Sequence, residues 1–304
     1  MMEEPLVSVV ALSYNHEKFI VSALESINRQ TYSSLEIILV DDASTDNSVE
    51  IAQTYLKQNN VSFSVKTIFL DNNVGNCTAF NRGLALVQGK YVIDFATDDI
   101  MLPRRIEQQV NFFESLPDDY GVVFTEAEYV DEAGEHLRYH YRDRLKHIRP
   151  IPTGDVYAEV LARYFISSPT MMIRKKVLDD LEGYDEQLAY EDFDFWVRSA
   201  RHWKYAYLAE CTTQIRKHAK SMSTGWYRPG DPQLYSTYLV CQKALKLNKN
   251  DEERRALATR LKYEIRQGFR SGNHKEVRLL YNLLRQLEKK ALFYRLLSAI
   301  SSFG

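Results

Sequence analysis

Short apolar segments alternate with amphipathic ones over the first 115 residues of the chain. Four segments are rich in β-branched residues and almost wholly apolar, as in strands buried on both faces, and they span residues 6–12, 35–40, 65–70 and 91–95. Three stretches between them place apolar residues at helical spacing, and they span residues 19–30, 48–56 and 74–87. This alternation predicts an α/β fold with a parallel sheet and helices on both faces.

The pattern beyond residue 103 is less regular. It predicts helices over residues 104–116 and 174–181, strands over residues 122–124 and 165–173, and a helix that carries the apolar residues Phe193, Trp196 and Val197. After Pro232 strand signals cease and helix-forming residues dominate, which predicts helices over residues 235–247, 252–269 and 275–298. We therefore expect a domain over residues 1–230, with halves 1–115 and 116–230, and a helical extension over residues 231–304.

Two interpretations of the helical extension remain open. Its apolar stripe can pack on the rest of the chain or on a second subunit. Alternatively, Lys289, Lys290 and Arg295 flank apolar residues such as Leu296, a pattern also found in peripheral membrane docks. No apolar run approaches the ~20 residues that a membrane span needs.

Composition excludes several classes of protein. The 304 residues are 45% hydrophobic, enough for a large core, and 39 basic against 41 acidic residues give no overall field that would attract nucleic acid. The three cysteines, Cys77, Cys211 and Cys241, are widely spaced and form no C-x-x-C pair. This spacing argues against a disulfide framework or a zinc site and favours the cytoplasm.

Two adjacent carboxylates, Asp98 and Asp99, follow the apolar segment 91–95. Carboxylates at the carboxyl end of a parallel strand face the crevice where α/β proteins bind ligands, and paired oxygens suit a hard divalent cation. The alternative is that they only cap the next helix. The chain lacks both G-x-G-x-x-G and G-x-x-x-x-G-K-[ST], so a nucleotide would be held by carboxylates, a metal and loop backbones.

Four blocks of sequence resemble the nucleotide-binding half of family-two glycosyltransferases, enzymes of the kind that build bacterial polysaccharides. The blocks are Val7-Ser-Val-Val-Ala-Leu-Ser-Tyr-Asn15, Glu36-Ile-Ile-Leu-Val-Asp-Asp-Ala-Ser-Thr-Asp46, Asn73-Val-Gly75 with Asn81-Arg-Gly83, and Gly89-Lys-Tyr-Val with Ala96-Thr-Asp-Asp99. Ala96 takes the place of an Asp that is common in the family. The resemblance implies the GT-A fold, a Rossmann-like, mostly parallel sheet flanked by helices, here with a C-terminal helical extension.

The resemblance also implies a donor site. Asp42 would accept the N3–H of a uracil or thymine ring, and Tyr14 would lie against that base. The other implied donor-binding residues are Ser13, Asn15, Asp41, Asn81 and Asp98. A Mn²⁺ or Mg²⁺ ion would be bound mainly by Asp99, with Asp98 and His218 near it. The bland alternatives are a helix cap for Asp42, a half-buried aromatic for Tyr14 and an ordinary surface histidine for His218.

Two later motifs resemble the acceptor half of the same family. In Tyr190-Glu-Asp-Phe-Asp194 the resemblance makes Asp192 the general base and Glu191 a residue that orients the acceptor or the base, although acids at a helix start are also ordinary caps. In Ile215-Arg-Lys-His218 it places His218 at the metal or the pyrophosphate, with Arg216 or Lys217 offsetting the leaving-group charge. Trp226 to Arg228 is a candidate lid by position alone.

The segment from residue 136 to 149 is basic and aromatic. Such a segment beside an active site can receive an anionic acceptor, such as a lipid-linked phosphate or an acidic glycan, or it can be a solvated surface. Its basic residues and histidines are His136, Arg138, His140, Arg142, Arg144, Lys146, His147 and Arg149.

These observations together predict an inverting hexosyltransferase. It would move a sugar from a UDP- or dTDP-sugar to a hydroxyl of a glycan or lipid-linked saccharide, in the cytoplasm or peripherally on the inner face of the membrane. Contact with a membrane or with a second copy would use the C-terminal helices. The alternatives are a nucleotidyltransferase, disfavoured by the missing glycine-rich signature, and a non-catalytic glycan-binding or scaffold protein of the same fold.

Overall fold

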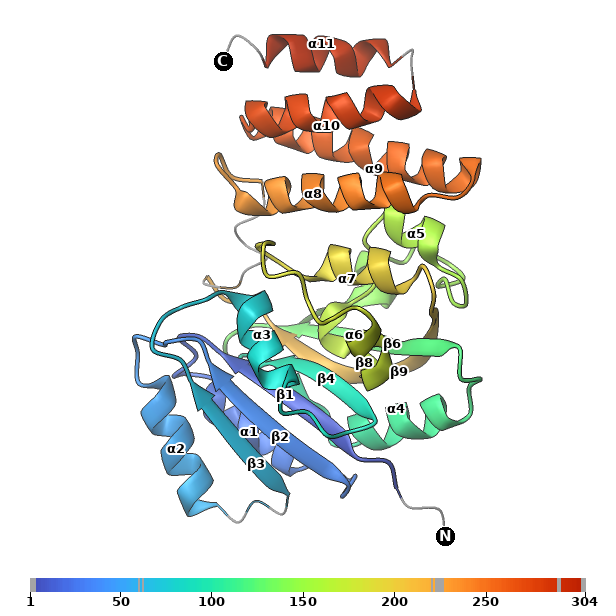
Figure 1. The fold of residues 1–304 in the computed structure, drawn as a ribbon. Helices are drawn as coiled ribbons and strands as arrows, with labels where there is room; N and C mark the ends of the chain where they lie inside the picture. Colours follow the sequence, from blue (N-terminus) through green and yellow to red (C-terminus); the bar gives the residue numbers. More distant parts are fainter. Residues whose placement is uncertain are drawn as a thin grey trace. The chain divides into compact units, whose positions relative to one another are not determined.

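The computed structural model describes residues 4–59, 61, 63–219, 221, 227–288 and 291–301 (Figure 1). The chain forms two compact units. The first unit consists of Met1–Asp155, Ile166–Glu186 and His202–His218, and the second of Val156–Phe165, Gln187–Arg201 and Ala219–Gly304.

The first half of the first unit confirms the predicted parallel sheet. Strand β1 pairs in parallel with both β2 and β4, and β2 pairs in parallel with β3. The strands are β1 (Val7–Ser13), β2 (Leu35–Asp41), β3 (Ser64–Phe69) and β4 (Tyr91–Ala96). The helices between them are α1 (Ile20–Asn28), α2 (Ser48–Gln58) and α3 (Asn76–Leu84). Because β1, β2 and β4 are parallel neighbours, the loops that follow them meet at one edge of the sheet.

Successive side chains of these strands face opposite helical layers. Val9 and Ile37 belong to a core cluster that also contains residues of α1, including Ile27, and of α2. On the other face, α3 approaches so closely that a Cβ added at Gly83 would lie 2.6 Å from Val10 Cγ1 and 3.0 Å from Val40 Cγ2. The sheet is therefore covered on both faces, as the sequence predicted.

The second half of the first unit makes the sheet mixed. Along the sheet the order is β3-β2-β1-β4-β8-β6-β9-β5, with β7 pairing β6. Strand β8 is antiparallel to β4 and β6, whereas β6 and β9 are parallel. The new strands are β5 (Ile100–Met101), β6 (Tyr120–Val130), β7 (His136–Tyr139), β8 (Met172–Arg174) and β9 (Lys204–Arg216). The helical segments are α4 (Arg105–Glu114), the π-turn η1 (His140–Arg144), the 3-10 turn η2 (Ser168–Thr170) and α6 (Lys175–Asp180).

Two strand predictions need correction. The strand predicted over residues 165–173 is mostly wrong, because Pro169, which has no N–H to donate, lies in the turn η2 and only Met172–Arg174 pairs in the sheet. The 13-residue strand β9 was not predicted at all. Its sequence does not alternate cleanly, and its pairing with β6 shifts register three times, so no period-2 pattern identifies it.

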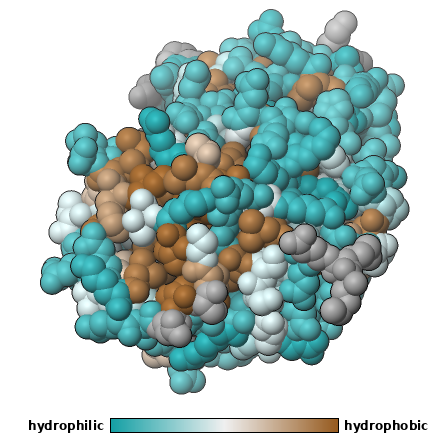
Figure 2. Space-filling model, turned by 60° about the horizontal axis from the view of Figure 1, so that its bottom comes forward, coloured by the Kyte–Doolittle hydropathy of each residue, from teal (hydrophilic) through white to brown (hydrophobic). Residues whose placement is uncertain are grey.

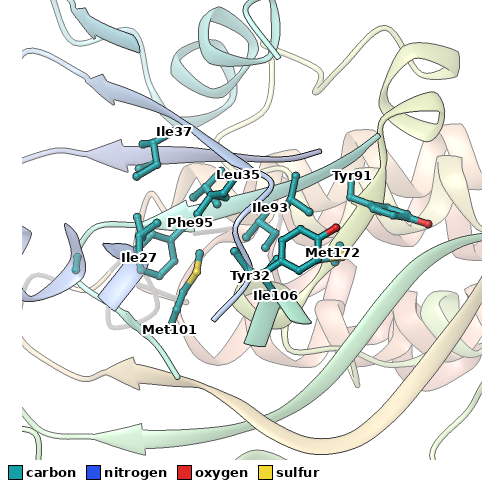
Figure 3. Close-up of a cluster of buried hydrophobic side chains, with 14 of the residues drawn as sticks. Ile27, Tyr32, Leu35, Ile37, Tyr91, Ile93, Phe95, Met101, Ile106 and Met172 are labelled. Carbon is teal, nitrogen blue, oxygen red and sulfur yellow. The ribbon is translucent and has the colours of Figure 1, made fainter. Parts of the chain in front are cut away.

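A cluster of apolar side chains fills the space beneath the sheet of the first unit (Figure 3). Strand β4 supplies Ile93 and Phe95, neither of which is exposed, and α4 supplies Ile106. Tyr91 stacks on Phe113 with ring centroids 4.6 Å apart. Fully burying one such large apolar side chain stabilises the fold by about 1.5–3 kcal/mol. On the outside, apolar residues gather in one region of the face drawn in Figure 2, and hydrophilic residues surround it.

The second unit is helical. Asp231 caps α8 by accepting from Gln233 N, and Asn250 caps α9 by accepting from Glu253 N. Its helices are α5 (Tyr157–Ala162), α7 (Asp192–Ser199), α8 (Pro232–Leu247), α9 (Asp251–Arg270), α10 (His274–Leu287) and α11 (Leu292–Ile300). Among the described residues no helix is both long and apolar enough to cross a membrane.

Candidate active site

The loops that follow β1 and β2 are fastened to each other by polar groups. Asn15 N donates to Ser44 Oγ at 2.8 Å, and Asn15 Oδ1 accepts from Thr45 N at 2.8 Å. Ser44 Oγ in turn donates to Asp41 Oδ2 at 2.6 Å. Two of the predicted donor-binding residues, Asn15 and Asp41, thus make contacts that fix the loops at the carboxyl ends of β1 and β2.

Asp42 directly follows β2 and is only 6% exposed. Its Oδ1 accepts from Val74 N at 2.7 Å, and its Oδ2 accepts from Gly75 N at 2.9 Å. Asp42 therefore does not cap α2, where Asp46 Oδ1 accepts from Ser48 N instead. Each oxygen of a carboxylate has two lone pairs, so Asp42 retains acceptor capacity for a further N–H group.

Ser13 is the last residue of β1, and Tyr14 is the first residue of the loop that follows it. Ser13 is 2% exposed, and its Oγ has no hydrogen-bond partner among the described residues. A buried hydroxyl without a partner is costly, which is a reason to look for a ligand group at this position. Tyr14 is 45% exposed and presents its ring to solvent, as a stacking surface for a base would require.

Asp98 is the centre of a polar cluster at the carboxyl end of β4. His218 Nε2 donates to Asp98 Oδ2 at 2.9 Å, and His16 Nε2 lies 3.9 Å from the same oxygen. The hydroxyl of Thr97 donates to Leu12 O, so it must accept its other hydrogen bond from His16 Nδ1. This assignment leaves the Nε2 lone pair of a neutral His16 facing Asp98.

The protonation of this cluster follows from its burial and its charges. Burial disfavours ionisation of Asp98, but the hydrogen bond from His218 and the neighbouring imidazoles outweigh it and lower the pKa of Asp98. Burial also lowers the pKa of His16 and favours its neutral form. The sequence analysis did not single out His16, although it directly follows Ser13-Tyr-Asn15 in the same loop.

Asp99 is hydrogen-bonded to the end of β9. Its Oδ1 accepts from Arg216 N at 2.9 Å, and Arg216 Nε donates to the Asp98 carbonyl at 3.0 Å. Burial and the adjacent Asp98 raise the pKa of Asp99. The carboxylate that contacts His218 is therefore that of Asp98, and Asp99 joins the β4 loop to the end of β9.

Asn81 lies on α3, and its side chain is hydrogen-bonded to a turn of the first unit. Its Oδ1 accepts from Tyr184 N at 2.9 Å, and its Nδ2 donates to Tyr184 O and to Glu186 Oε1. These contacts use both amide hydrogens and one lone pair of its oxygen. They connect α3 with the turn that follows α6.

Glu191 and Asp192 belong to the second unit, where Glu191 precedes α7 and Asp192 is its first residue. The side chain of Glu191 makes no capping hydrogen bond, so the bland capping interpretation gains no support from it. The sequence analysis missed Asp194, which is 1% exposed and lies 2.6 Å from both Arg198 Nε and Lys243 Nζ. The i, i+4 spacing of Asp194 and Arg198 was the available signal.

The His, Cys, Asp and Glu side chains of the site show whether a metal ion fits. Among the described residues no three His, Cys, Asp or Glu side chains are grouped as a ready metal site. Asp98 Oδ2 and His218 Nε2, however, are 2.9 Å apart, a separation that two neighbouring ligands of one ion can have. A carboxylate suits Mn²⁺ or Mg²⁺, whereas an imidazole is a more usual ligand of Zn²⁺ or Fe²⁺. The candidate lid around Trp226 lies partly outside the described residues.

Comparison with known proteins identifies the class. The family model "Glycosyl transferase family 2" matches residues 8–182, more than half of the chain. The chain belongs to this family of transferases, and its fold is GT-A with a C-terminal helical part. The resemblance seen in the sequence is thereby confirmed.

Several relatives and solved structures are similar to the chain. It is 30% identical to an uncharacterized glycosyltransferase of Methanocaldococcus jannaschii, with 71% of this chain and 72% of the relative covered, and 30% identical to EpsE of Bacillus subtilis, with 83% and 87% covered. Other relatives are longer, and the match spans 32% of a glycosyltransferase of Rickettsia felis.

Two solved structures share the fold at low identity. Residues 1–349 of TarS from S. aureus, in complex with UDP-GlcNAc, align with a TM-score of 0.74 and 18% identity, over 97% of this chain and 89% of that one. A mannosyltransferase of Pyrobaculum calidifontis, in complex with GDP-Man and Mn²⁺, aligns with a TM-score of 0.62 and 17% identity, over 99% and 85%.

Proposed function

We propose that the protein is an inverting glycosyltransferase that uses a UDP- or dTDP-sugar and glycosylates a hydroxyl of a glycan or lipid-linked saccharide. The observation that supports this proposal most directly is the arrangement of Asp42 and Asp98 at the carboxyl ends of β2 and β4, the two strands that flank β1, with His218 hydrogen-bonded to Asp98. The nucleotide-sugar complexes of structures with the same fold are consistent with it.

In this proposal the donor lies along the edge formed by the ends of β2, β1 and β4. Asp42 accepts the N3–H of uracil or thymine, a donor that cytosine lacks, while the exposed ring of Tyr14 stacks on the base. The Ser13 hydroxyl, which has no hydrogen-bond partner among the described residues, supplies a further polar contact to the nucleotide. The diphosphate then reaches Asp98 and His218.

The residues that would hold a metal are Asp99, Asp98 and His218, of which Asp98 Oδ2 and His218 Nε2 lie 2.9 Å apart. A divalent ion bound there would supply charge neutralisation for the diphosphate. The pKa of Asp98 is low, so the carboxylate is ionised and ready to bind a cation. Arg216 adds positive charge on the side of the leaving group.

The chemical step is a single displacement at the anomeric carbon of the donor. The acceptor oxygen forms a bond to that carbon as its bond to the diphosphate breaks, and the acceptor proton passes to Asp192. Attack on the face opposite the leaving group inverts the configuration, so no covalent intermediate is needed. Glu191 orients the acceptor or the base.

A thermal-shift panel tests the proposal. A ligand that binds only the folded protein raises the melting temperature by mass action. We expect UDP or dTDP and their sugars to raise it, more so with Mn²⁺ or Mg²⁺, and CDP to raise it much less. Equal shifts with UDP and CDP, or no shift with any uridine or thymidine nucleotide, would refute the donor assignment.

A further inference from the structure

Three basic side chains gather around Tyr129 in the first unit and form what we call the cationic cluster, namely Arg138, Arg144 and Lys217. The Arg138 guanidinium carbon lies 5.2 Å from the Tyr129 ring centroid, and Lys217 Nζ lies 4.9 Å from it. Arg144 is near enough that it opposes the rise in the pKa of Tyr129 that burial causes. Tyr129 is thus a buried aromatic side chain that contacts the charged groups of Arg138 and Lys217, with Arg144 close enough to interact with it electrostatically.

The backbone holds these side chains together. Tyr129 and Arg138 are direct partners across β6 and β7, so their side chains share one face of the sheet. Lys217 N donates to Val130 O at 2.8 Å, which fixes the residue that follows β9 beside the end of β6. The cluster is therefore built from three segments that are distant in sequence.

The segment that carries Arg144 is fastened from below by Glu126. Glu126 is 2% exposed, its Oε1 accepts from Tyr141 N at 2.8 Å, and its Oε2 accepts from Arg142 N at 3.1 Å. His140 Nδ1 and Tyr129 Oη lie 2.8 Å apart, in a further hydrogen bond of the same segment. The basic segment is consequently folded onto the sheet in this region, and the cluster has a defined position.

The cluster concentrates like charge beside the candidate active site. Burial lowers the pKa of Lys217, and the proximity of Arg144 and Arg138 lowers it further, while Asp99 and Asp98 oppose this. Within the described part of the chain, neither Arg138 nor Arg144 forms an ion pair with a carboxylate within 4.0 Å. Glu128, the acid of β6 next to Tyr129, is already engaged by His136 at 2.6 Å and by Gln214 at 2.9 Å.

The order of the sheet shows which ligand group can reach the cluster. Asp42 follows β2 and Asp98 follows β4, whereas the cluster belongs to β6, β7 and the end of β9, which lie beyond β4 on the side away from β2. A nucleotide-sugar donor that extends from Asp42 to Asp98 has its base at Asp42 and its diphosphate at Asp98. Neither group then needs the cationic cluster. The next reactant in that direction is the acceptor.

We propose that the cationic cluster binds a phosphate group of the acceptor substrate, which is thus a phosphate-bearing saccharide or polymer. Two arginines and a lysine suit the charge and geometry of phosphate, and Arg binds it bidentately. This inference rests on the proposed function, because the position of the donor defines which side belongs to the acceptor.

The test uses sn-glycerol 3-phosphate as a probe, measured by saturation-transfer NMR on the full chain with UDP and Mg²⁺ at saturation. Glycerol and glycerate serve as the uncharged and carboxylate probes. We expect glycerol 3-phosphate to bind while UDP is present, and glycerate and glycerol to bind far less. Arg138→Ala and Arg144→Ala should each lower the affinity for glycerol 3-phosphate roughly ten-fold and leave the affinity for UDP unchanged.

Lys146→Ala is the matched control, because Lys146 is an exposed basic residue of the same segment outside the cluster. Equal weakening in Lys146→Ala would show diffuse surface attraction and overturn the inference. So would loss of the probe when UDP is added, since the cluster would then belong to the donor diphosphate, or equal binding of glycerate. A wild type that does not bind UDP counts against the proposed function, whereas one that binds UDP but not the phosphate probe counts against the cluster.

Discussion

Asp98 shows how a single carboxylate can be prepared for a cation by its neighbours. Burial raises the pKa of Asp98, but the hydrogen bond from His218 helps to outweigh it, so that the pKa is lowered and the carboxylate is ionised. His16 Nε2 lies 3.9 Å from the same oxygen, and the tautomer of a neutral His16 is set by Thr97. Neither histidine is near Asp98 in sequence. The charge state of this residue is therefore a property of three loops together.

The first prediction concerns Asp98→Asn. The amide keeps the size of the side chain but removes the negative charge, so the metal-dependent part of the UDP thermal shift should disappear and transfer activity should fall at least about 100-fold. The thermal shift is measured with and without Mn²⁺. Glu25→Gln, an exposed acid paired with Arg29, is the control and should behave as wild type. An unchanged metal response in Asp98→Asn would remove this residue from the metal site.

The second prediction concerns Asp42→Asn. An amide nitrogen would face a backbone N–H of the 74–75 turn or the N3–H of the base, so one acceptor is lost. We expect the UDP affinity to fall by about ten- to 100-fold and the preference for UDP over CDP to shrink, since CDP lacks that N–H. Calorimetric titration of both nucleotides measures this. A retained preference would place base recognition elsewhere.

Among the secondary-structure elements, a buried polar residue also joins the strands of the first unit. Glu36 on β2 is 2% exposed; its Oε1 accepts from Ser8 Oγ on β1 and from Gln88 N, and its Oε2 accepts from Lys66 Nζ on β3. Burial opposes ionisation of Glu36, but these hydrogen bonds prevail and lower its pKa. The ionised carboxylate thus connects three strands and the turn before β4.

The third prediction follows from the sign of that shift. A carboxyl whose pKa is lower in the folded state adds stability above its unfolded pKa and loses it as the pH falls through the folded pKa. Glu36→Gln should therefore lower the free energy of unfolding by about 1–3 kcal/mol at pH 7 and reduce the loss of stability below about pH 4.5. Urea titrations at pH 7 and pH 4 measure both effects. A Glu36→Gln protein with an unaltered pH profile would contradict the linkage.

The fourth prediction concerns Gly83, where α3 meets the sheet. A Cβ there would lie 2.6 Å from Val10 Cγ1, so Gly83→Ala should destabilise the protein by about 1–3 kcal/mol through overpacking. Thermal and urea unfolding measure the change. Ala85→Ser, at an exposed position just after the same helix, is the control and should lie within about 0.5 kcal/mol of wild type. A neutral Gly83→Ala would mean that α3 can shift without cost.

For the molecule as a whole, the proposed donor-binding residues and the proposed catalytic residues lie in different parts of the chain. The donor-binding residues lie in the first unit, whereas Asp192 and Glu191 lie in the second. We therefore expect nucleotide affinity and the rate of transfer to change independently in variants of these two sets of residues. Asp192→Asn should lower kcat/KM by about 10²–10⁴ and leave the UDP dissociation constant unchanged.

Asp194→Asn, two residues away, distinguishes this effect from structural damage. Asp194 is a buried partner of Arg198 and Lys243, so its loss should lower the free energy of unfolding by about 2–4 kcal/mol. Full activity in Asp192→Asn would exclude this residue as the base. A destabilised Asp192→Asn with weak UDP binding would show a structural role instead.

Local patterns in the sequence are enough to identify the parallel half of the sheet, its three helices and the family. Strands β1, β2 and β4 are mainly apolar because both of their faces are covered, and this pattern is local in the chain. The motifs around Asp42 and Asp98 were visible for the same reason, since each lies within one short segment.

The contacts between segments that are distant in the sequence depend on tertiary packing. Strand β9 has no clear period and is stabilised by its long pairing with β6, so its place in the sheet could not be read locally. The contacts of Asp98 with His218 and of Tyr129 with Lys217 join residues about 90 to 120 positions apart. Pairing across such separations depends on the packed sheet, and no local pattern of hydrophobic and polar residues encodes it.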